Sequence, residues 1–263
     1  MSATLTYVYC LVRAARPPSV RGVPGPVPGA RSVRLLEVPP RAQSPKSKVR
    51  DWLVVSSVPA EQYDEAALER ELKRDEWVIP RALAHEAVVE HFLSLPAVLP
   101  MQLFTLFTSD ERASEHMIRD RRRIARIFAR IEGRLEWGLR VTLGGIRGQT
   151  LGLTPRGAPA RSGGEYLARK RDLREAGRTA LNRARRDAER VYRTIRRTAA
   201  AARRRTEVER AVPGSRVVLD AAFLVPAERR RTFQAFVRRQ TRPLQRVGMT
   251  VSLTGPWPAY NFI

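Results

Sequence analysis

The residues best suited to chemistry are the histidine–glutamate pair His85 and Glu86 and the single cysteine, Cys10. A zinc-protease motif needs a second histidine four residues after the first, so that both side chains share one helix face and one metal ion. Position 89 is Val89, and His91 falls on a different face of the predicted helix. We therefore expect these histidines to make core or capping contacts rather than to bind zinc.

The other candidate chemical groups are weaker. Cys10 lies in an apolar segment without a neighbouring basic helix terminus, which is typical of a buried, inert thiol, and one cysteine excludes an intramolecular disulfide. The glycine-rich stretch at 144–148 lacks the lysine and the strand-to-helix context of a phosphate-binding loop, so it is predicted to be a hairpin loop. No Ser/His/Asp arrangement and no pair of carboxylates in a predicted cleft stands out. We expect no catalysis, no cofactor, no metal and no small-molecule substrate.

The charge balance is strongly basic, with 49 Lys and Arg against 26 Asp and Glu and a formal net charge of +23. Such a field attracts nucleic acid, anionic membranes or acidic protein surfaces. All but four of the basic residues are arginines, and alanine and proline are abundant, as in proteins from GC-rich genomes. Codon composition and selection for an anionic partner therefore remain alternative explanations of the charge.

The apolar segments do not indicate a membrane or secreted protein. The stretch at 92–109 carries no charge, but Pro96, Pro100 and Gln102 interrupt it, which favours a buried turn and strand over a membrane span. The apolar run at 5–12 has no basic residue before it and no cleavage signal after it, so it is not predicted to be a signal peptide. We expect a cytosolic setting.

Hydrophobic periodicity and turn residues divide the chain into two α+β domains. In the first domain, residues 1–108, strands are expected at 4–12, 32–38 and 51–58, helices from Pro59 and over 80–95, and an extended segment at 97–107. This order suggests a ferredoxin-like sandwich. In the second domain, residues 109–263, we expect helices at 109–132, 165–210 and 226–247 and strands at 134–143, 215–225 and 249–253.

The long helix predicted at 165–210 is the most unusual element. Its apolar seam has small residues at alternating spacings of three and four, which predicts a coiled-coil-like arm packed on the helix at 109–132; the seam comprises Leu181, Ala184, Ala188, Val191, Ile195, Thr198 and Ala202. The helix also carries sixteen basic and seven acidic residues, which could bind RNA or DNA. Only Tyr166 and Tyr192 could stack on bases, and the acids are dispersed among the arginines, so a salt-bridged exposed helix is favoured.

The chain ends in GPWPAYNFI, an uncharged aromatic segment in an otherwise arginine-rich protein. The expected strand at 249–253 is followed by Gly255-Pro256, which should turn the chain out of the sheet because proline cannot continue the ladder. Trp257, Tyr260 and Phe262 could then fold back over the sheet or the domain junction, or they could contact a partner. We favour the structural role, in which Trp257→Ala lowers the stability by about 3 kcal/mol.

Several landmarks occur in a fixed order over nearly the whole chain. They are TYVYCLV near the start, HEAVVEHFLSLPAVLPMQLFTLF in the middle, GGEYLARK at the start of the long helix, a later FLV, and the terminal GPWPAYNF. Together they resemble the gas vesicle protein GvpL/GvpF family, of which the terminal motif is the most specific mark. The Arg-Phe-Gly-Thr that many members carry after the mid-chain Leu-Pro-x is replaced by Gln102 to Thr105, so a GvpL-like and a GvpF-like role both stay open.

The resemblance implies an accessory or minor structural protein of gas vesicles that is not an enzyme and is located in the vesicle or, during assembly, in the cytoplasm. Its implied partners are the shell protein and other accessory proteins, and its implied fold has two α+β domains. A nucleic-acid-binding protein that uses the arginine-rich helix is the alternative. The candidate partner-binding or signature residues are Tyr166, Leu167, Arg169, Arg185, Arg186, Arg193, Gly255, Pro256, Trp257, Pro258, Tyr260 and Phe262.

Overall fold

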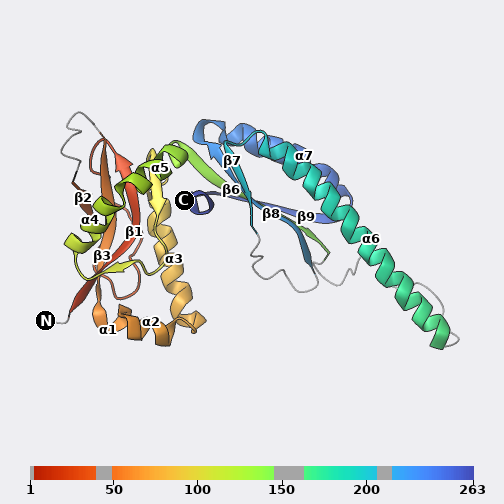
Figure 1. The fold of residues 1–263 in the computed structure, drawn as a ribbon, viewed down its shortest axis with the longest axis horizontal. Helices are drawn as coiled ribbons and strands as arrows, with labels where there is room; N and C mark the ends of the chain where they lie inside the picture. Colours follow the sequence, from red (N-terminus) through yellow and green to blue (C-terminus); the bar gives the residue numbers. More distant parts are fainter. Residues whose placement is uncertain (1–2, 40–48, 145–162, 206–214) are drawn as a thin grey trace. The chain divides into compact units, whose positions relative to one another are not determined.

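The structure is a computed structural model that describes residues 3–39, 49–144, 163–205 and 215–263 (Figure 1). It contains two antiparallel sheets with helices packed on them, in two compact units. The first unit comprises Met1–Leu135 and Trp257–Ile263, and the second comprises Glu136–Pro256. The mixed α and β content expected from the sequence is therefore confirmed.

The sheet of the first unit has the strand order β2-β3-β1-β4, with β5 also paired to β1. Its strands are β1 (Thr4–Ala14), β2 (Arg34–Val38), β3 (Arg50–Pro59), β4 (Ala97–Pro100) and β5 (Leu106–Phe107). Strand β1 lies centrally because its residues are almost all apolar and can be buried on both faces. The extended segment predicted at 97–107 is divided, because residues 101–105 lie outside the ladder.

A register shift between Val8 and Cys10 interrupts the pairing of β1 with β3. Such a bulge changes which side chains along a strand share a face. As a result, Tyr7, Cys10 and Val12 of β1 lie in one apolar cluster. The same cluster includes Val88 and Val89 from the helical part of the unit. The thiol of Cys10 is fully buried, as expected, and burial raises its pKa.

The helices of the first unit are α1 (Ala60–Tyr63), α2 (Glu65–Glu71), α3 (Asp75–His91), α4 (Asp110–Arg119) and α5 (Arg121–Ile131). The helix predicted from Pro59 is broken at Asp64, whose side chain caps α2 by accepting a hydrogen bond from the Ala67 N–H. Helix α3 begins five residues before the predicted position 80. The single helix predicted at 109–132 is two helices that meet at Asp120, and Ile118 is exposed.

The division of the chain differs from the predicted boundary after residue 108. Residues 110–131 were assigned to the second domain, but α4 packs on β1 and β2, and α5 packs on β4. Their apolar faces, which include Met117, Ile124 and Phe128, are buried in the first unit. Periodicity predicts a helix in this region, but it carries no information about which sheet the helix covers.

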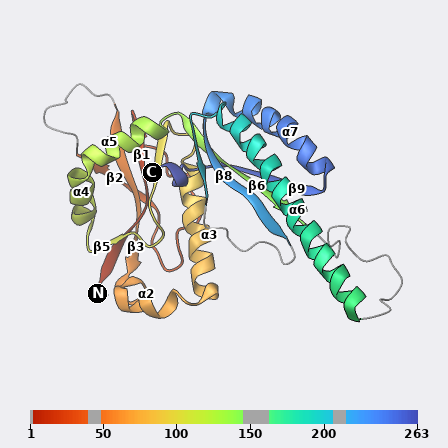
Figure 2. The same cartoon turned by 45° about the vertical axis from the view of Figure 1, so that its right-hand side comes forward.

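The sheet of the second unit has the order β7-β8-β6-β9. Its strands are β6 (Arg134–Leu143), β7 (Ala201–Arg204), β8 (Arg216–Pro226) and β9 (Met249–Trp257), and its helices are α6 (Gly163–Arg196) and α7 (Arg230–Arg246), the latter preceded by a 3-10 turn at Ala227–Arg229. The strand predicted at 134–143 is present as β6, and its alternate residues Trp137, Leu139 and Val141 lie in one core cluster with residues of both helices. Figure 2 shows α6 and α7 together on this sheet.

Helix α6 differs from the predicted arm in its length and in its packing. It ends at Arg196 instead of 210, and the chain enters β7 at Ala201; residues 206–210 lie outside the described part. The seam residues Leu181, Ala184 and Ile195 are buried, as predicted. The seam packs on β8 and α7, however, and not on the helix predicted at 109–132. The loop expected at 144–164, including the hairpin at 144–148, lies almost entirely outside the described residues.

Candidate functional site

An exposed row of arginines follows the solvent-facing side of α6, and we call it the arginine stripe; its members are Arg183, Arg186, Arg190 and Arg193. Residues spaced by three and four positions share a helix face. The opposite side of the helix carries the small seam residues that pack on the sheet. The sequence therefore places the stripe in solvent because the apolar seam fixes the rotation of α6.

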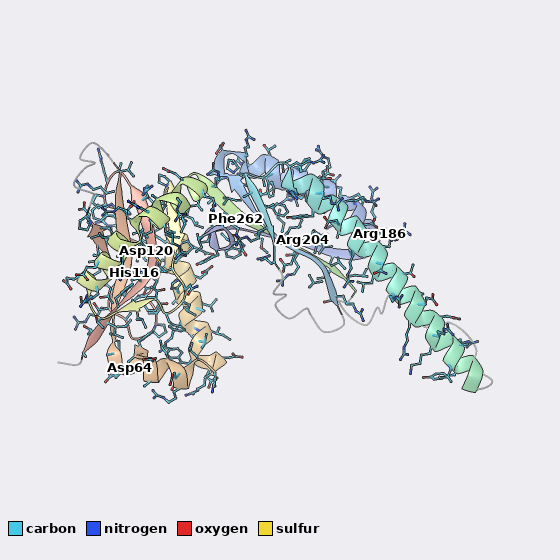
Figure 3. All side chains as sticks on the ribbon, in the orientation of Figure 1. Asp64, His116, Asp120, Arg186, Arg204 and Phe262 are labelled. Atoms are coloured by element: carbon cyan, nitrogen blue, oxygen red, sulfur yellow. The ribbon has the colours of Figure 1, made fainter. Side chains whose placement is uncertain are left out.

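Beside the stripe is an open hollow of about 1020 Å³, lined by arginines of α6, by Arg204 of β7 and by Val218 of β8. Figure 3 labels Arg186 on α6 and Arg204 on the strand side. The Arg204 guanidinium lies 4.9 Å from the ring centre of Tyr192, a cation–π contact that holds it against the helix. Arg204 also forms an ion pair with Glu189.

The acidic residues of this surface neutralise only part of its charge. Asp187 pairs with Arg190 at 2.5 Å, and Glu189 pairs with Arg193 at 2.9 Å. Within the described part of the chain, Arg183, Arg185 and Arg186 form no ion pair; all three are exposed. Three guanidinium groups are thus free to bind an external anion.

Of the residues predicted from the long helix, Arg185, Arg186 and Arg193 line this hollow. Tyr166 and Leu167 do not, because they lie near the start of α6, 56% and 64% exposed, and about 24 to 26 Å along the helix axis from Arg183. Arg169 lies on the same distant turns. Arg183, Arg190 and Arg204 were missed; the regular spacing of 183, 186, 190 and 193 was the sequence signal that could have identified two of them.

The terminal segment packs within the first unit, which it re-enters at Trp257. Pro258, Ala259 and Phe262 are buried, whereas Trp257 is only half-buried. The Arg130 guanidinium of α5 donates a hydrogen bond of 3.1 Å to the Phe262 carbonyl. The expected aromatic cover is therefore built around Phe262 rather than Trp257.

The sequence predicts that Gly255 and Pro256 turn the chain out of the sheet, and this prediction is wrong. Strand β9 continues through both residues to Trp257, and the peptide bond between them is cis. Pro256 is exposed, and neither residue belongs to the packed terminal segment of the first unit. The signature motif is thus divided between the end of a strand and a packed segment.

Tyr260 connects the terminal segment to α3. Its hydroxyl donates a hydrogen bond of 2.5 Å to the Glu86 carboxylate. Burial raises the pKa of Glu86, although the Tyr260 hydrogen bond opposes the shift, and burial together with this bond raises the pKa of Tyr260. Glu86, considered first for zinc chemistry, therefore holds the chain end.

Next to this bond is a groove of about 710 Å³ between α3, the segment after β4, and α4 and α5. Its walls are mostly apolar and include Met101, Met117 and Ile124, and His85 is among the lining residues. His85 is 3% exposed, and the distance between its Nδ1 and the Tyr7 hydroxyl oxygen is 2.9 Å. Burial lowers the pKa of His85 to about 4.

His85 is thus a core residue, as the sequence analysis favoured. His91 is at the last turn of α3, beside the ring of Phe92. Among the residues that the structure describes, no group of three or more His, Cys, Asp or Glu side chains could hold a metal ion. None of the described helices combines the length and the apolar character needed to cross a membrane.

Comparison with known proteins gives consistent matches. The family model described as "Gas vesicle synthesis protein GvpL/GvpF" matches residues 5–263. "Gas vesicle protein L" of Streptomyces sp. (strain CB03234) is 33% identical over 214 residues, which cover 80% of this chain and 78% of the relative.

Two crystal structures have a similar fold. GvpF from Anabaena sp. PCC7120 superposes with a TM-score of 0.64 at 13% identity, covering 98% of each chain. GvpF from Microcystis aeruginosa superposes with a TM-score of 0.60 at 12% identity, covering 99% of each chain. At these identities the likeness concerns the fold alone, and it extends over both units.

Proposed function

The chain belongs to the gas vesicle synthesis protein GvpL/GvpF family, and from this premise we propose that it is an accessory or minor structural protein that acts in vesicle assembly through protein–protein contacts. The family match over residues 5–263 carries the proposal. The contacts would be made with the shell protein and other accessory proteins, in the cytoplasm during assembly or in the vesicle itself. No reaction is part of the proposed role.

Two surfaces support a role in binding. The arginine stripe with its hollow offers uncompensated positive charge on the second unit. The groove beside the terminal segment offers mostly apolar walls with a few polar side chains on the first unit. Surfaces of these two kinds suit protein partners, since charged rims steer association and apolar concavities supply contact area.

We also infer that the first unit is a variant of the ferredoxin-like sandwich. In the order β2-β3-β1-β4, β3 lies between β1 and β2, and β1 lies between β3 and β4, which is the arrangement of two split crossovers. The connection from β3 to β4 contains α1, α2 and α3. The connection from β1 to β2, residues 15–33, contains no helix and would be the departure from the usual pattern.

Deletion of the gene from a vesicle-forming host tests the proposed function. We expect electron microscopy to show few or no vesicles, and a plasmid-borne copy of the full chain to restore them. A pull-down with the shell protein should recover the full chain. Normal vesicles in the deletion strain would refute a role in assembly.

A further inference from the structure

The four arginines of the arginine stripe recur along α6 at alternating spacings of three and four residues. From Arg183 to Arg193 the stripe extends about 15 Å along α6, with steps of about 4.5 to 6 Å between successive members. All four side chains are exposed and come from a rigid helix whose other face is buried. The four arginines therefore form a row along one face of the helix rather than a scattered basic surface.

The array is only partly neutralised from within. Asp187 and Glu189 contact Arg190 and Arg193, whereas Arg183 and Arg186 have no acidic partner in the described part of the chain. Beside them, Arg185 is also free, and the Arg204 guanidinium extends the positive surface toward the sheet. A ligand for this surface must therefore bring several negative charges.

Carboxylates suit this array better than nucleic acid does. Arginine binds carboxylates and phosphates alike through paired N–H donors, but single-stranded nucleic acid also needs exposed aromatic rings for base stacking. Tyr192, the aromatic residue nearest the stripe, is buried beneath Arg204. Tyr166 is exposed but lies about 26 Å away along the helix axis.

The spacing favours a helical ligand over an extended one. Acidic residues at positions i, i+3, i+7 and i+10 of a second helix would repeat the same steps, so that four carboxylates could face four guanidinium groups. In an extended strand, side chains of one face recur at about 6.6 Å and lose register with the stripe within two steps.

We propose that the arginine stripe of α6 binds an acidic helix of a gas vesicle component, with carboxylates at alternating spacings of three and four. This inference deepens the proposed function and depends on it, because it names the chemistry of the partner in assembly. Individually exposed ion pairs are weak, so the set acts together and is sensitive to salt.

Fluorescence anisotropy with the full-length protein can test the binding. The probe is a labelled helical peptide with Glu at the four matching positions, and its controls are a Gln version and a version with the same Glu residues in scrambled order. The test variant is Arg183→Gln/Arg186→Gln/Arg190→Gln. The matched control, Arg229→Gln/Arg230→Gln/Arg231→Gln, removes the same charge from exposed positions at the start of α7.

We expect the stripe variant to weaken binding of the Glu peptide about tenfold at 0.15 M salt, and the α7 control to change it less than twofold. The scrambled and Gln peptides should bind more weakly than the ordered Glu peptide. Equal losses in both variants, or equal binding of the scrambled peptide, would overturn the proposal. The proposal would also be overturned if a 20-nucleotide single strand bound more tightly than the ordered Glu peptide and lost this binding in the stripe variant, because the stripe would then be a nucleic-acid-binding surface.

Circular dichroism melting checks that the stripe variant folds. If it does not fold, Arg186→Gln alone replaces it, with an expected loss of peptide binding of about twofold.

Vesicle formation in the deletion strain distinguishes failure of the stripe proposal from failure of the proposed role in assembly. If the deletion strain lacks vesicles and both variants restore them equally, the stripe proposal fails and the assembly role stands. If the deletion strain makes normal vesicles, the assembly role itself fails.

Discussion

Phe262 is the side chain that anchors the chain end, and its truncation should be costly. It is 4% exposed, while Trp257 is half-buried, so Phe262→Ala should lower the free energy of unfolding by about 3 to 5 kcal/mol. Trp257→Ala, predicted from the sequence to cost about 3 kcal/mol, should cost less than Phe262→Ala. Chemical denaturation of the two variants measures the difference, and a larger loss for Trp257→Ala would contradict the packing described.

His85 should make the protein sensitive to mild acid. Its pKa is lowered to about 4 in the folded state, from 6.5 in the unfolded chain, so the unfolded state binds more protons between these values. Stability is therefore complete above about pH 6.5 and falls as the pH is lowered toward 4, by about 3 kcal/mol in total.

The variant His85→Gln keeps an acceptor for the Tyr7 hydroxyl but does not titrate. Urea denaturation at pH 7 and pH 4.5 should show a smaller acid-induced loss for this variant than for the unmodified protein. Equal losses in the two proteins would assign the acid sensitivity to other groups.

At the scale of elements, a buried carboxylate connects three strands of the second unit. The Asp220 side chain of β8 is 1% exposed and accepts hydrogen bonds from Arg140 of β6 at 2.9 Å and from Arg205, just after β7, at 2.7 Å. Gly138 leaves space beside this arrangement, since a Cβ there would lie 2.8 Å from the Thr254 Oγ1 atom and 3.1 Å from the Arg205 Nη2 atom. The sequence does not reveal this cluster, because its members are distant along the chain and no local pattern marks them.

Asp220→Ala should lower the stability by about 3 kcal/mol or more, because it removes the buried carboxylate that accepts hydrogen bonds from both arginines. The control Asp187→Ala removes the acid of an ion pair whose arginine is exposed, and it should cost less than about 1 kcal/mol. Thermal unfolding of the two variants measures the contrast. Similar small losses would show that Asp220 does not hold the strands together.

At the scale of the whole molecule, the chain crosses between its two units twice. It leaves the first unit at Leu135 and re-enters it at Trp257, so the first unit is completed by the last seven residues. The hydrogen bonds from Tyr260 to Glu86 and from Arg130 to the Phe262 carbonyl fix this return. A boundary read along the sequence places each residue in a contiguous segment, and for that reason the predicted division could not include this exchange.

The sequence alone determined the strands β1, β3, β6 and β8 and the buried seam of α6, through their hydrophobic periodicity. It also determined the family, through motifs that occur in a fixed order along the chain. These features are local, since an apolar repeat fixes which face of an element is buried. Tertiary structure alone decided that the seam of α6 packs on β8 and α7, that α4 and α5 belong to the first unit, and that Phe262 rather than Trp257 is buried. Each of these depends on contacts between residues far apart in the chain, and hydrophobic burial is non-directional, so an apolar face does not specify which surface will cover it.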